Sequence, residues 1–284
     1  MIPKILDGKQ LSLEIKYEIK NEIDNLIQNN HELSNIAIIQ VGDIPASSVY
    51  INNKKKAFNE LGIKYFHHHL PDNITENDLL LMIKGLNSTD SISGIFVQLP
   101  LPKHISEYKV FNAIDKNKDI DCFNPDNIGN LYLNKASYTP CTPTGIIELL
   151  KRNNIEIEGK NCVIIGRSDI VGKPLSLMLL HENASVTVLH SKSKNIQEIS
   201  SKADILITAI GKPKFIDDKY IKPGAVVIDV GINRDENNKL CGDVDFDKVY
   251  PICSAITPVP GGVGPMTVTM LMKNCLKSLQ FNRR

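Results

Sequence analysis

Short apolar segments alternate with helical segments along almost the whole chain, and this alternation restricts the fold more than any other feature. The apolar segments are six to nine residues long and mostly rich in Val and Ile, as expected for buried strands. The predicted strands cover residues 35–42, 63–70, 94–102, 161–166, 185–190, 204–211 and 225–231. Strands separated by helices are typical of a parallel sheet covered by helices.

The alternation lapses between residues 115 and 143, where Asp, Asn, Pro and Gly dominate, so this stretch is the best candidate for a linker or cleft wall. We therefore predict an α/β chain of two αβα domains flanking a cleft. The first, over residues 1–140, is the expected substrate-binding and catalytic domain, and the second, over 141–264, is Rossmann-like. An apolar helix over 265–284 is expected to pack back on the first domain.

Composition argues against several classes of protein. The formal net charge is +1 and no basic stripe is present, so we expect no nucleic-acid partner. No apolar run approaches a membrane span, and the first ten residues are too weakly apolar for a signal peptide, so we expect a cytoplasmic protein without a membrane partner. Six scattered cysteines without a CxxC pair predict reduced thiols.

A glycine-containing turn follows the predicted strand at 161–165. It begins with Gly166, and helical spacing resumes near Val171. A strand, a glycine turn and a helix N-terminus in this order present free backbone N–H groups and a positive dipole to a pyrophosphate. The spacing differs from GxGxxG, so the context carries more weight than the motif.

The end of the following strand bears on which dinucleotide is bound. NAD-selecting enzymes usually place a carboxylate there for the ribose 2′-OH. This chain has His190, Ser191 and Lys192 instead. Together with Arg167, these residues favour a 2′-phosphate and therefore NADP. The alternative is a ligand-free turn with basic surface residues.

Tyr50 and Lys54 are four residues apart in a predicted helix, so the phenol and the ammonium lie on one face, with Ser47 one turn earlier. A lysine desolvated beside an aromatic ring loses proton affinity and can exchange protons near neutral pH. Taken alone, the pair is better explained as a half-buried tyrosine beside an exposed lysine run. Short-chain dehydrogenases share the YxxxK spacing but place it after the dinucleotide-binding strands, whereas here it precedes them.

Seven segments, in order and covering nearly the whole chain, resemble the methylenetetrahydrofolate dehydrogenase/methenyltetrahydrofolate cyclohydrolase family. They are VGDIPASSVYINNKKKAFNELGI, GIFVQLPLP, KDIDCFNPDNIGNL, PCTPTGIIELL, VIIGRSDIVGKP, VTVLHSKS and TPVPGGVGPMTVTMLM. The resemblance implies NADP-dependent oxidation of 5,10-methylenetetrahydrofolate to the methenyl form, followed by hydrolysis to 10-formyltetrahydrofolate. It also implies a homodimer that binds tetrahydrofolate one-carbon derivatives and serves purine biosynthesis.

The same resemblance implies residue roles. Lys54 would transfer the proton of the hydrolytic step, Tyr50 would stack on the folate, and Gln98 would hydrogen-bond Lys54. Asp121 would accept the N–H groups of the pterin, a paired-donor edge that suits a carboxylate. The implied substrate-binding residues are Ser47, Tyr50, Val97, Gln98, Leu99, Pro100, Asp121, Pro260, Gly261 and Gly262. The implied NADP-binding residues are Gly166, Arg167, Ser168, Ser191 and Ile232.

These assignments have simpler alternatives. Gln98 could merely cap a strand before two prolines, Asp121 could be a solvated loop carboxylate, and residues 261–264 could be a flexible entry to the last helix. The run His67-His68-His69 suggests a metal, but adjacent strand residues point to opposite faces and no acidic or cysteine partner is evident. We therefore expect no metal site.

One position departs from the family pattern. The residue after the pterin-binding aspartate is usually glycine in the family, whereas here it is Cys122. A side chain at that position needs room, and a positive φ would add a cost in energy. The departure concerns the local geometry of the pterin pocket and not the assignment of Asp121.

Two other functions remain open from the residues. One is a dehydrogenase of similar domain order for a shikimate-like or amino-acid-like substrate, against which Asp121 and residues 260–264 argue. The other is a catalytically inactive nucleotide sensor, which would not need Lys54 and Gln98.

Hydride transfer depends on proximity and orientation, so the oxidation should tolerate changes at Lys54 better than the hydrolysis does.

Overall fold

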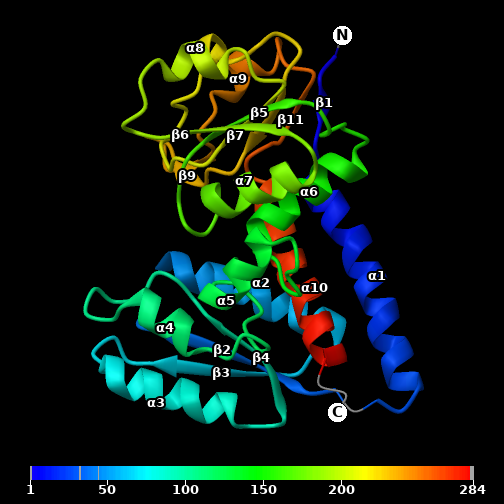
Figure 1. The fold of residues 1–284 in the computed structure, drawn as a ribbon, viewed down its shortest axis with the longest axis vertical. Helices are drawn as coiled ribbons and strands as arrows, with labels where there is room; N and C mark the ends of the chain where they lie inside the picture. Colours follow the sequence, from blue (N-terminus) through cyan, green and yellow to red (C-terminus); the bar gives the residue numbers. More distant parts are fainter. Residues whose placement is uncertain (1, 32, 44, 282–284) are drawn as a thin grey trace. The chain divides into compact units, whose positions relative to one another are not determined.

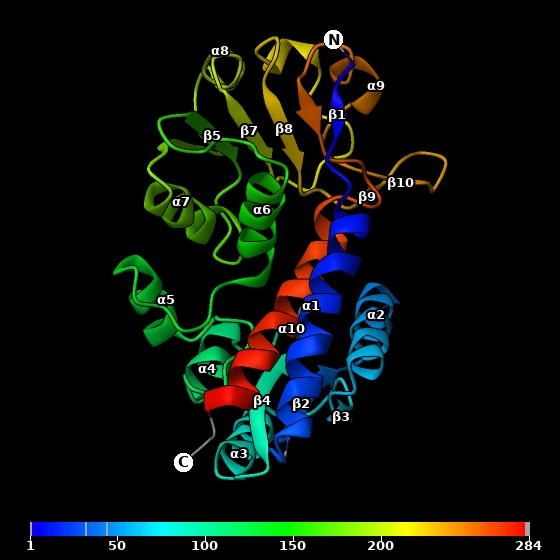
Figure 2. The ribbon, with the colours of Figure 1, turned by 90° about the vertical axis from the view of Figure 1, so that its right-hand side faces the viewer.

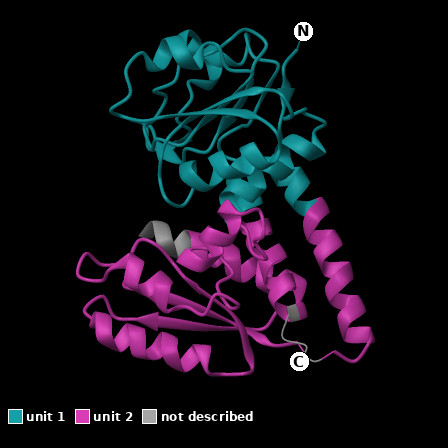
Figure 3. Cartoon of the chain, in the orientation of Figure 1, with its two compact units in different colours: residues 1–13, 140–267 teal, residues 14–139, 268–284 magenta. Residues whose placement is uncertain are grey.

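The computed structural model describes the backbone of residues 2–31, 33–43 and 45–281, and their side chains apart from those of 45–49 and 281. The chain divides into two compact units (Figure 3). Unit 1 contains residues 1–13 and 140–267, and unit 2 contains residues 14–139 and 268–284. Helices α1 (Gly8–Gln28) and α10 (Val263–Phe281) each begin in unit 1 and continue in unit 2.

Unit 2 is built on a three-stranded parallel sheet in the order β3-β2-β4. Besides parts of α1 and α10, its elements are β2 (Asn35–Val41), α2 (Pro45–Leu61), β3 (Tyr65–Leu70), α3 (Glu76–Asn87), β4 (Ile92–Val97), α4 (Glu107–Ala113) and α5 (Pro125–Tyr132). β2 is buried from Ile36 to Val41, as expected when helices cover both faces of a parallel sheet. Residues of α3 and α4 pack on one face of this sheet. The side chains of Ser93 in β4 and Ser278 in α10 are within hydrogen-bond distance at 3.3 Å, and both elements are labelled in Figure 1.

Unit 1 is a doubly wound α/β unit around a six-stranded parallel sheet in the order β1-β11-β8-β7-β5-β6. Its strands are β1 (Lys4–Ile5), β5 (Asn161–Ile165), β6 (Ser185–Leu189), β7 (Ile205–Thr208), β8 (Val226–Asp229) and β11 (Ala255–Ile256), with an antiparallel hairpin of β9 (Asn233–Arg234) and β10 (Leu240–Cys241). Its helices are α6 (Cys141–Arg152), α7 (Gly172–His181), α8 (Ile196–Ser200), α9 (Phe246–Val249) and the 3-10 helix η1 (Asp218–Tyr220). Figures 1 and 2 show α6 and α7 on one face of this sheet and α8 and α9 on the other.

The predicted α/β class with parallel sheets is confirmed, and each predicted strand overlaps an observed one. Thr75 caps α3, because its hydroxyl accepts a hydrogen bond from the backbone N–H of Asp78 at 3.1 Å. The stretch 115–143, predicted to be a linker or cleft wall, contains α5. Asn124 caps that helix and Pro125 occupies its first turn, a combination that favours a helix start.

The first residues of the chain are placed by long-range pairing. Lys4 and Ile5 form parallel pairs with Ala255 and Ile256, so β1 becomes an edge strand of the sheet in unit 1. Two residues carry no periodicity that could indicate this pairing. Among the described residues, no helix is both long and apolar enough to cross a membrane.

Candidate active site

Lys54 is the best-placed candidate for proton transfer in unit 2. It lies in α2 and is only 8 % exposed, whereas Lys56, two residues further along the same run, is exposed and lies 3.9 Å from Glu60. The alternative of a solvent-exposed lysine run therefore holds for Lys56 and not for Lys54. The Lys54 ammonium is 4.2 Å from the centre of the Phe96 ring, a cation–π contact shielded from water.

Gln98 orients the Lys54 side chain. The Lys54 Nζ donates to Gln98 Oε1 at 3.1 Å, and Gln98 Nε2 donates to the Leu99 carbonyl oxygen at 2.7 Å. An ammonium can only donate, and the amide nitrogen is already engaged, so Gln98 must turn its oxygen toward Lys54. The backbone N–H of Gln98 also bonds the Ile39 oxygen at 2.8 Å, which fixes this residue to the sheet. Gln98 thus does more than cap a strand.

Tyr50 precedes Lys54 by one helical turn on the same face of α2 and is 36 % exposed. Burial raises the pKa of its phenol, so the hydroxyl stays protonated near neutral pH. The exposed part of this side chain is available to an apolar or aromatic ligand. The side chain of Ser47, also predicted here, lies outside the described residues.

The loop that carries Asp121 is organised by three residues that the sequence did not single out, Asp119, Asn124 and Asn127. Asp119 is buried, and its Oδ2 accepts bonds from the Asn124 backbone N–H at 2.8 Å and from Asn127 Nδ2 at 2.9 Å. Burial raises the pKa of Asp119 to about 6, against the lowering effect of these hydrogen bonds. Asp121 itself is half-buried.

Asp121 and Lys54 both lie near the buried thiol of Cys275 in α10. Burial raises the pKa of that thiol, Asp121 acts in the same direction, and Lys54 opposes it. Because Asp121 and Lys54 both act on the pKa of the Cys275 thiol, both charged groups lie in its neighbourhood. Unit 2 therefore brings Lys54, Gln98 and Asp121 into one region, although they are distant in the sequence.

Cys122 adopts the backbone conformation that glycine favours. Its φ is 61°, and its side chain is fully buried. The Cys122 Sγ donates to the Tyr138 carbonyl oxygen at 3.2 Å, so the side chain has both room and a partner. Burial also raises the pKa of the thiol, which keeps it protonated and inert as a nucleophile.

The remaining substrate-site candidates fall into two segments. In unit 2, Val97 is buried at the end of β4, while Leu99 is half-buried and Pro100, joined to it by a cis peptide bond, is exposed. In unit 1, Pro260 is exposed and also follows a cis peptide bond, and Gly261 has a φ of 111°.

The glycines after Pro260 pack closely against the start of α1. The Lys9 backbone N–H bonds the Gly261 oxygen at 2.8 Å, and a Cβ on Gly262 would lie 2.6 Å from the Pro258 oxygen. A Cβ on Gly8 would overlap the Gly262 oxygen. Such close packing of backbone on backbone makes this segment a fixed wall and not a flexible entry to α10.

The turn after β5 has the form of a phosphate cradle. Gly166 has a φ of 142°, and a Cβ there would overlap the Ala209 oxygen. A Cβ on Gly172, the first residue of α7, would overlap the Gly166 oxygen, so both positions require glycine. Between them Arg167 and Ser168 are exposed, and Ser168 Oγ accepts the Val171 backbone N–H at 3.2 Å. The turn therefore holds two polar side chains at the N-terminus of a helix.

The turn after β6 presents a second polar surface. It also lies at the carboxyl ends of the strands, because β5 and β6 are parallel neighbours. Ser191 and Lys192 are exposed there, and the Lys192 backbone N–H bonds His190 Nδ1 at 3.1 Å. Ile232, the last predicted cofactor contact, is 47 % exposed in the loop after β8, and its Cδ1 is 3.5 Å from the position of a Cβ on Gly264.

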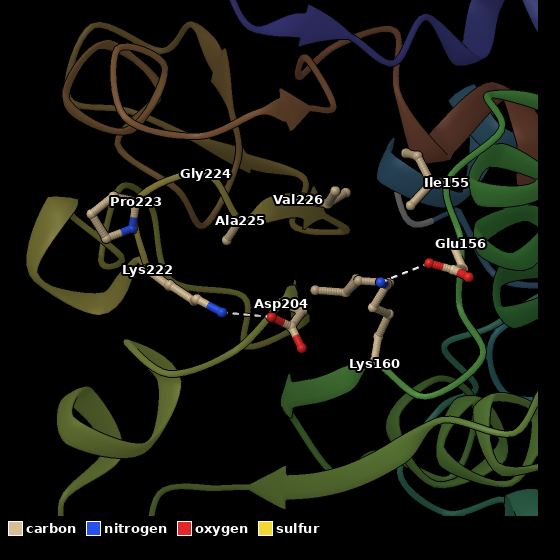
Figure 4. Close-up of a pocket in the computed structure, with 10 residues that line it drawn as sticks. Ile155, Glu156, Lys160, Asp204, Lys222, Pro223, Gly224, Ala225 and Val226 are labelled. Carbon is tan, nitrogen blue, oxygen red and sulfur yellow. Dashed lines mark hydrogen bonds and ion pairs between the residues drawn. The ribbon is translucent and has the colours of Figure 1, made fainter.

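A cavity of about 410 Å³ in unit 1 lies at the amino ends of the strands of this sheet (Figure 4). Lys160, Asp204 and Ala225, which line it, directly precede β5, β7 and β8. Its charged groups pair with one another, Lys222 with Asp204 at 2.6 Å and Lys160 with Glu156 at 2.7 Å. Ligands of open parallel sheets bind at the carboxyl ends of the strands, so this cavity is not the nucleotide site.

The three histidines of β3 are engaged mainly by local groups. His67 Nε2 lies 3.1 Å from Gln40 Oε1, and His69 Nε2 lies 3.2 Å from the Gly42 oxygen and 3.1 Å from an Asp43 oxygen. The His68 Nε2 is buried without a hydrogen-bond partner. Within the part of the chain that the structure describes, no group of three or more His, Cys, Asp or Glu side chains is arranged to hold a metal ion.

The fold and the turn after β5 define an α/β protein with a dinucleotide-binding unit and a second unit that carries a buried lysine. Comparison with known proteins narrows this class. Residues 6–121 match the model of the tetrahydrofolate dehydrogenase/cyclohydrolase catalytic domain, and residues 140–283 match that of the NAD(P)-binding domain of the same enzymes. The chain belongs to the tetrahydrofolate dehydrogenase/cyclohydrolase family.

Full-length relatives agree with this assignment. The chain is 57 % identical over 272 residues to the bifunctional protein FolD of Lachnoclostridium phytofermentans, covering 96 % of each protein. It resembles the crystal structure of the bifunctional enzyme FolD from Campylobacter jejuni with a TM-score of 0.95 and 48 % identity, over 98 % of this chain and 99 % of that one. It also resembles the Trypanosoma brucei enzyme in complex with NADP and an inhibitor, with a TM-score of 0.94 and 36 % identity over 99 % of each chain. The predicted family is thereby confirmed.

Proposed function

We propose that the chain oxidises 5,10-methylenetetrahydrofolate to 5,10-methenyltetrahydrofolate with NADP and then hydrolyses the product to 10-formyltetrahydrofolate. The observation that carries this proposal is the buried Lys54 ammonium, held by Gln98 at 3.1 Å and lying over Phe96 at 4.2 Å, in a member of a bifunctional family. Family membership disfavours both the shikimate-type dehydrogenase and the inactive sensor.

Lys54 is the proposed proton-transfer residue of the hydrolytic step. A water molecule adds to the methenyl carbon and loses one proton to the Lys54 amine. The bond from that carbon to N5 then breaks and N5 receives a proton from the Lys54 ammonium. The carbinol hydroxyl releases the second proton of the water to solvent as the C=O bond forms, and the formyl group remains on N10. Gln98 accepts a hydrogen bond from Nζ in either protonation state, so it holds the side chain in place through both transfers.

The folate would be held mainly by residues of unit 2. Tyr50 offers a ring for stacking, and Asp121 offers a carboxylate to the paired N–H donors of the pterin. Further proposed substrate contacts are Ser47, Val97, Gln98, Leu99, Pro100, Pro260, Gly261 and Gly262.

The residues at the carboxyl edge of the unit 1 sheet fit NADP. When bound, NADP⁺ supplies the hydride acceptor. Gly166 and Gly172 allow the tight turn at the N-terminus of α7 that would receive a pyrophosphate, with Arg167 and Ser168 beside it. Ser191 and Lys192 are available to a 2′-phosphate, and Ile232 presents an apolar surface to a ring.

We propose the domain limits given above, with 1–140 and 265–284 forming the folate-binding domain and 141–264 the nucleotide-binding domain. The compact units support this division in the main part and assign residues 1–13, 140 and 265–267 to the nucleotide-binding unit. We further propose a cytoplasmic homodimer that supplies 10-formyltetrahydrofolate for purine biosynthesis. Sedimentation equilibrium tests the dimer, since a monomer mass at micromolar concentration would contradict it.

The function is tested with two absorbance assays on the purified protein. The first follows methylenetetrahydrofolate with NADP⁺ or NAD⁺, and the second follows methenyltetrahydrofolate alone. Lys54→Met should abolish the hydrolysis and retain a measurable oxidation, because hydride transfer needs no proton at Lys54. Lys56→Met, an exposed lysine of the same helix, serves as the matched control and should leave both rates unchanged. Hydrolysis that survives in Lys54→Met would refute the role of Lys54.

A further inference from the structure

Two buried aspartates lie behind the loops that follow β7 and β8. Asp229 is the last residue of β8 and is 3 % exposed, and Asp243, which follows the β9–β10 hairpin, is fully buried. Neither residue was singled out by the sequence. Buried carboxylates are costly unless hydrogen bonds compensate their charge, so the partners of these two indicate what they hold.

Asp229 ties the hairpin to the end of its strand. Its Oδ1 accepts the backbone N–H groups of Gly231 at 3.0 Å and Asp243 at 2.9 Å, and its Oδ2 accepts that of Val244 at 2.9 Å. Burial raises the pKa of Asp229 to about 6, and the three N–H groups oppose that rise.

Asp243 ties the same region to the loop after β7. Its Oδ2 accepts the backbone N–H groups of Ile210 at 2.7 Å and Gly211 at 3.3 Å. Its Oδ1 accepts the Lys212 backbone N–H at 2.8 Å and Asn233 Nδ2 at 2.9 Å. One carboxylate therefore joins residues 210–212 to the hairpin, across 31 to 33 positions of sequence.

Two glycines allow the carboxylates to come this close. A Cβ on Gly231 would overlap the Asp243 carboxylate, and a Cβ on Gly242 would overlap Asp229 Oδ2. Gly231 directly precedes Ile232, the proposed cofactor contact, and Asn233 directly follows it. Ile232 thus lies between two residues that are each bonded to one of the aspartates.

We propose that Asp243 and Asp229 are positioning residues that hold the loops after β7 and β8 in shape for NADP. This inference rests on the proposed function, because it takes NADP as the ligand of this sheet edge. Consecutive N–H groups such as those of residues 210–212 form a concave donor site suited to an anion. Here the protein's own Asp243 fills it, so that loop is closed to a phosphate and the turn at Gly166 remains for the pyrophosphate.

Asp243→Asn tests the proposal at nearly constant volume. An amide has one acceptor oxygen in place of two, so its NH₂ group must face either the N–H groups of Ile210 and Gly211 or those of Lys212 and Asn233. We expect the Kd for NADP, measured by isothermal titration calorimetry, to rise about tenfold or more. Hydrolysis of methenyltetrahydrofolate, which uses no NADP, should proceed at the wild-type rate with an unchanged KM.

Asp247→Asn is the matched control, since Asp247 is exposed four residues further along and should leave both measurements unchanged. An Asp243→Asn protein that melts earlier but binds NADP with the wild-type Kd would overturn the proposal, because the carboxylate would then be structural only. A wild-type protein that binds no NADP would overturn the proposed function as well, which distinguishes the two failures.

Asn233→Ala tests the proposed positioning role of Asp243 if the Asp243→Asn protein does not fold. It removes one hydrogen bond to Asp243 Oδ1 and leaves the three backbone bonds of that carboxylate in place. We expect the Kd for NADP to rise about threefold or more with little change in melting temperature. An unchanged Kd in this variant would overturn the proposal.

Discussion

From the positive φ of Cys122 we predict the relative stability of two variants with small substitutions at this position. Cys122→Ala removes the buried thiol and its bond to the Tyr138 oxygen but keeps a Cβ at a φ of 61°. Cys122→Gly also removes the Cβ and with it the steric cost of that conformation. The comparison between Ala and Gly at this position therefore reports the backbone strain once the ordinary cost of an Ala-to-Gly change is subtracted.

The magnitude follows from opposing contributions to the free energy of unfolding. At an ordinary buried position, replacing Ala by Gly costs about 0.8 kcal/mol for the lost methyl group and about 1 kcal/mol for the added freedom of the unfolded chain. At position 122, the Gly variant is freed of the strain of the positive φ, which stabilises it by about 1–2 kcal/mol relative to the Ala variant. The two variants should thus agree within about 0.8 kcal/mol.

Urea unfolding followed by circular dichroism measures this difference, and Ala37→Gly provides the matched control in the same unit. Ala37 is fully buried in β2, so its replacement should cost about 2 kcal/mol. If Cys122→Gly were about 2 kcal/mol less stable than Cys122→Ala, the positive φ would carry no cost and the reasoning would be wrong.

Two further predictions concern the cofactor turn and the buried acid of the pterin loop. Gly166→Ala should abolish measurable NADP binding in calorimetry, because its Cβ would overlap the Ala209 oxygen, whereas Gly159→Ala, with a φ of 72° and open space, should bind normally; equal binding by both would contradict the cradle. Asp119 has a pKa raised to about 6, so its folded form holds the proton more tightly than the unfolded chain does. Stability from this group is therefore full below about pH 4 and is lost as the pH rises to about 6, by up to about 3 kcal/mol. Asp119→Asn should flatten that decline in urea unfolding, and a decline of wild-type size would show that Asp119 is not its source.

Local patterns in the sequence were enough for the elements and for several site residues. The strand of β2 and the cap at Thr75 are visible as apolar periodicity and turn chemistry, which depend on neighbours within a few residues. The pairing of Lys54 with Gln98 was implied by resemblance to a family and not by spacing, since 44 positions separate the two residues. Without that resemblance, Lys54 would have been assigned to the surface.

Only the tertiary structure decided which distant groups meet. The addition of β1 to the unit 1 sheet, the burial of Lys54 over Phe96 and the conformation of Cys122 all depend on contacts that no local pattern records. Asp243 is the clearest case: in the sequence it is one of several acids in a polar stretch, yet its carboxylate binds a loop 31 to 33 residues away. The physical reason is that periodicity reports which face of an element is buried, whereas the partner buried against it is chosen by the packing of the whole chain.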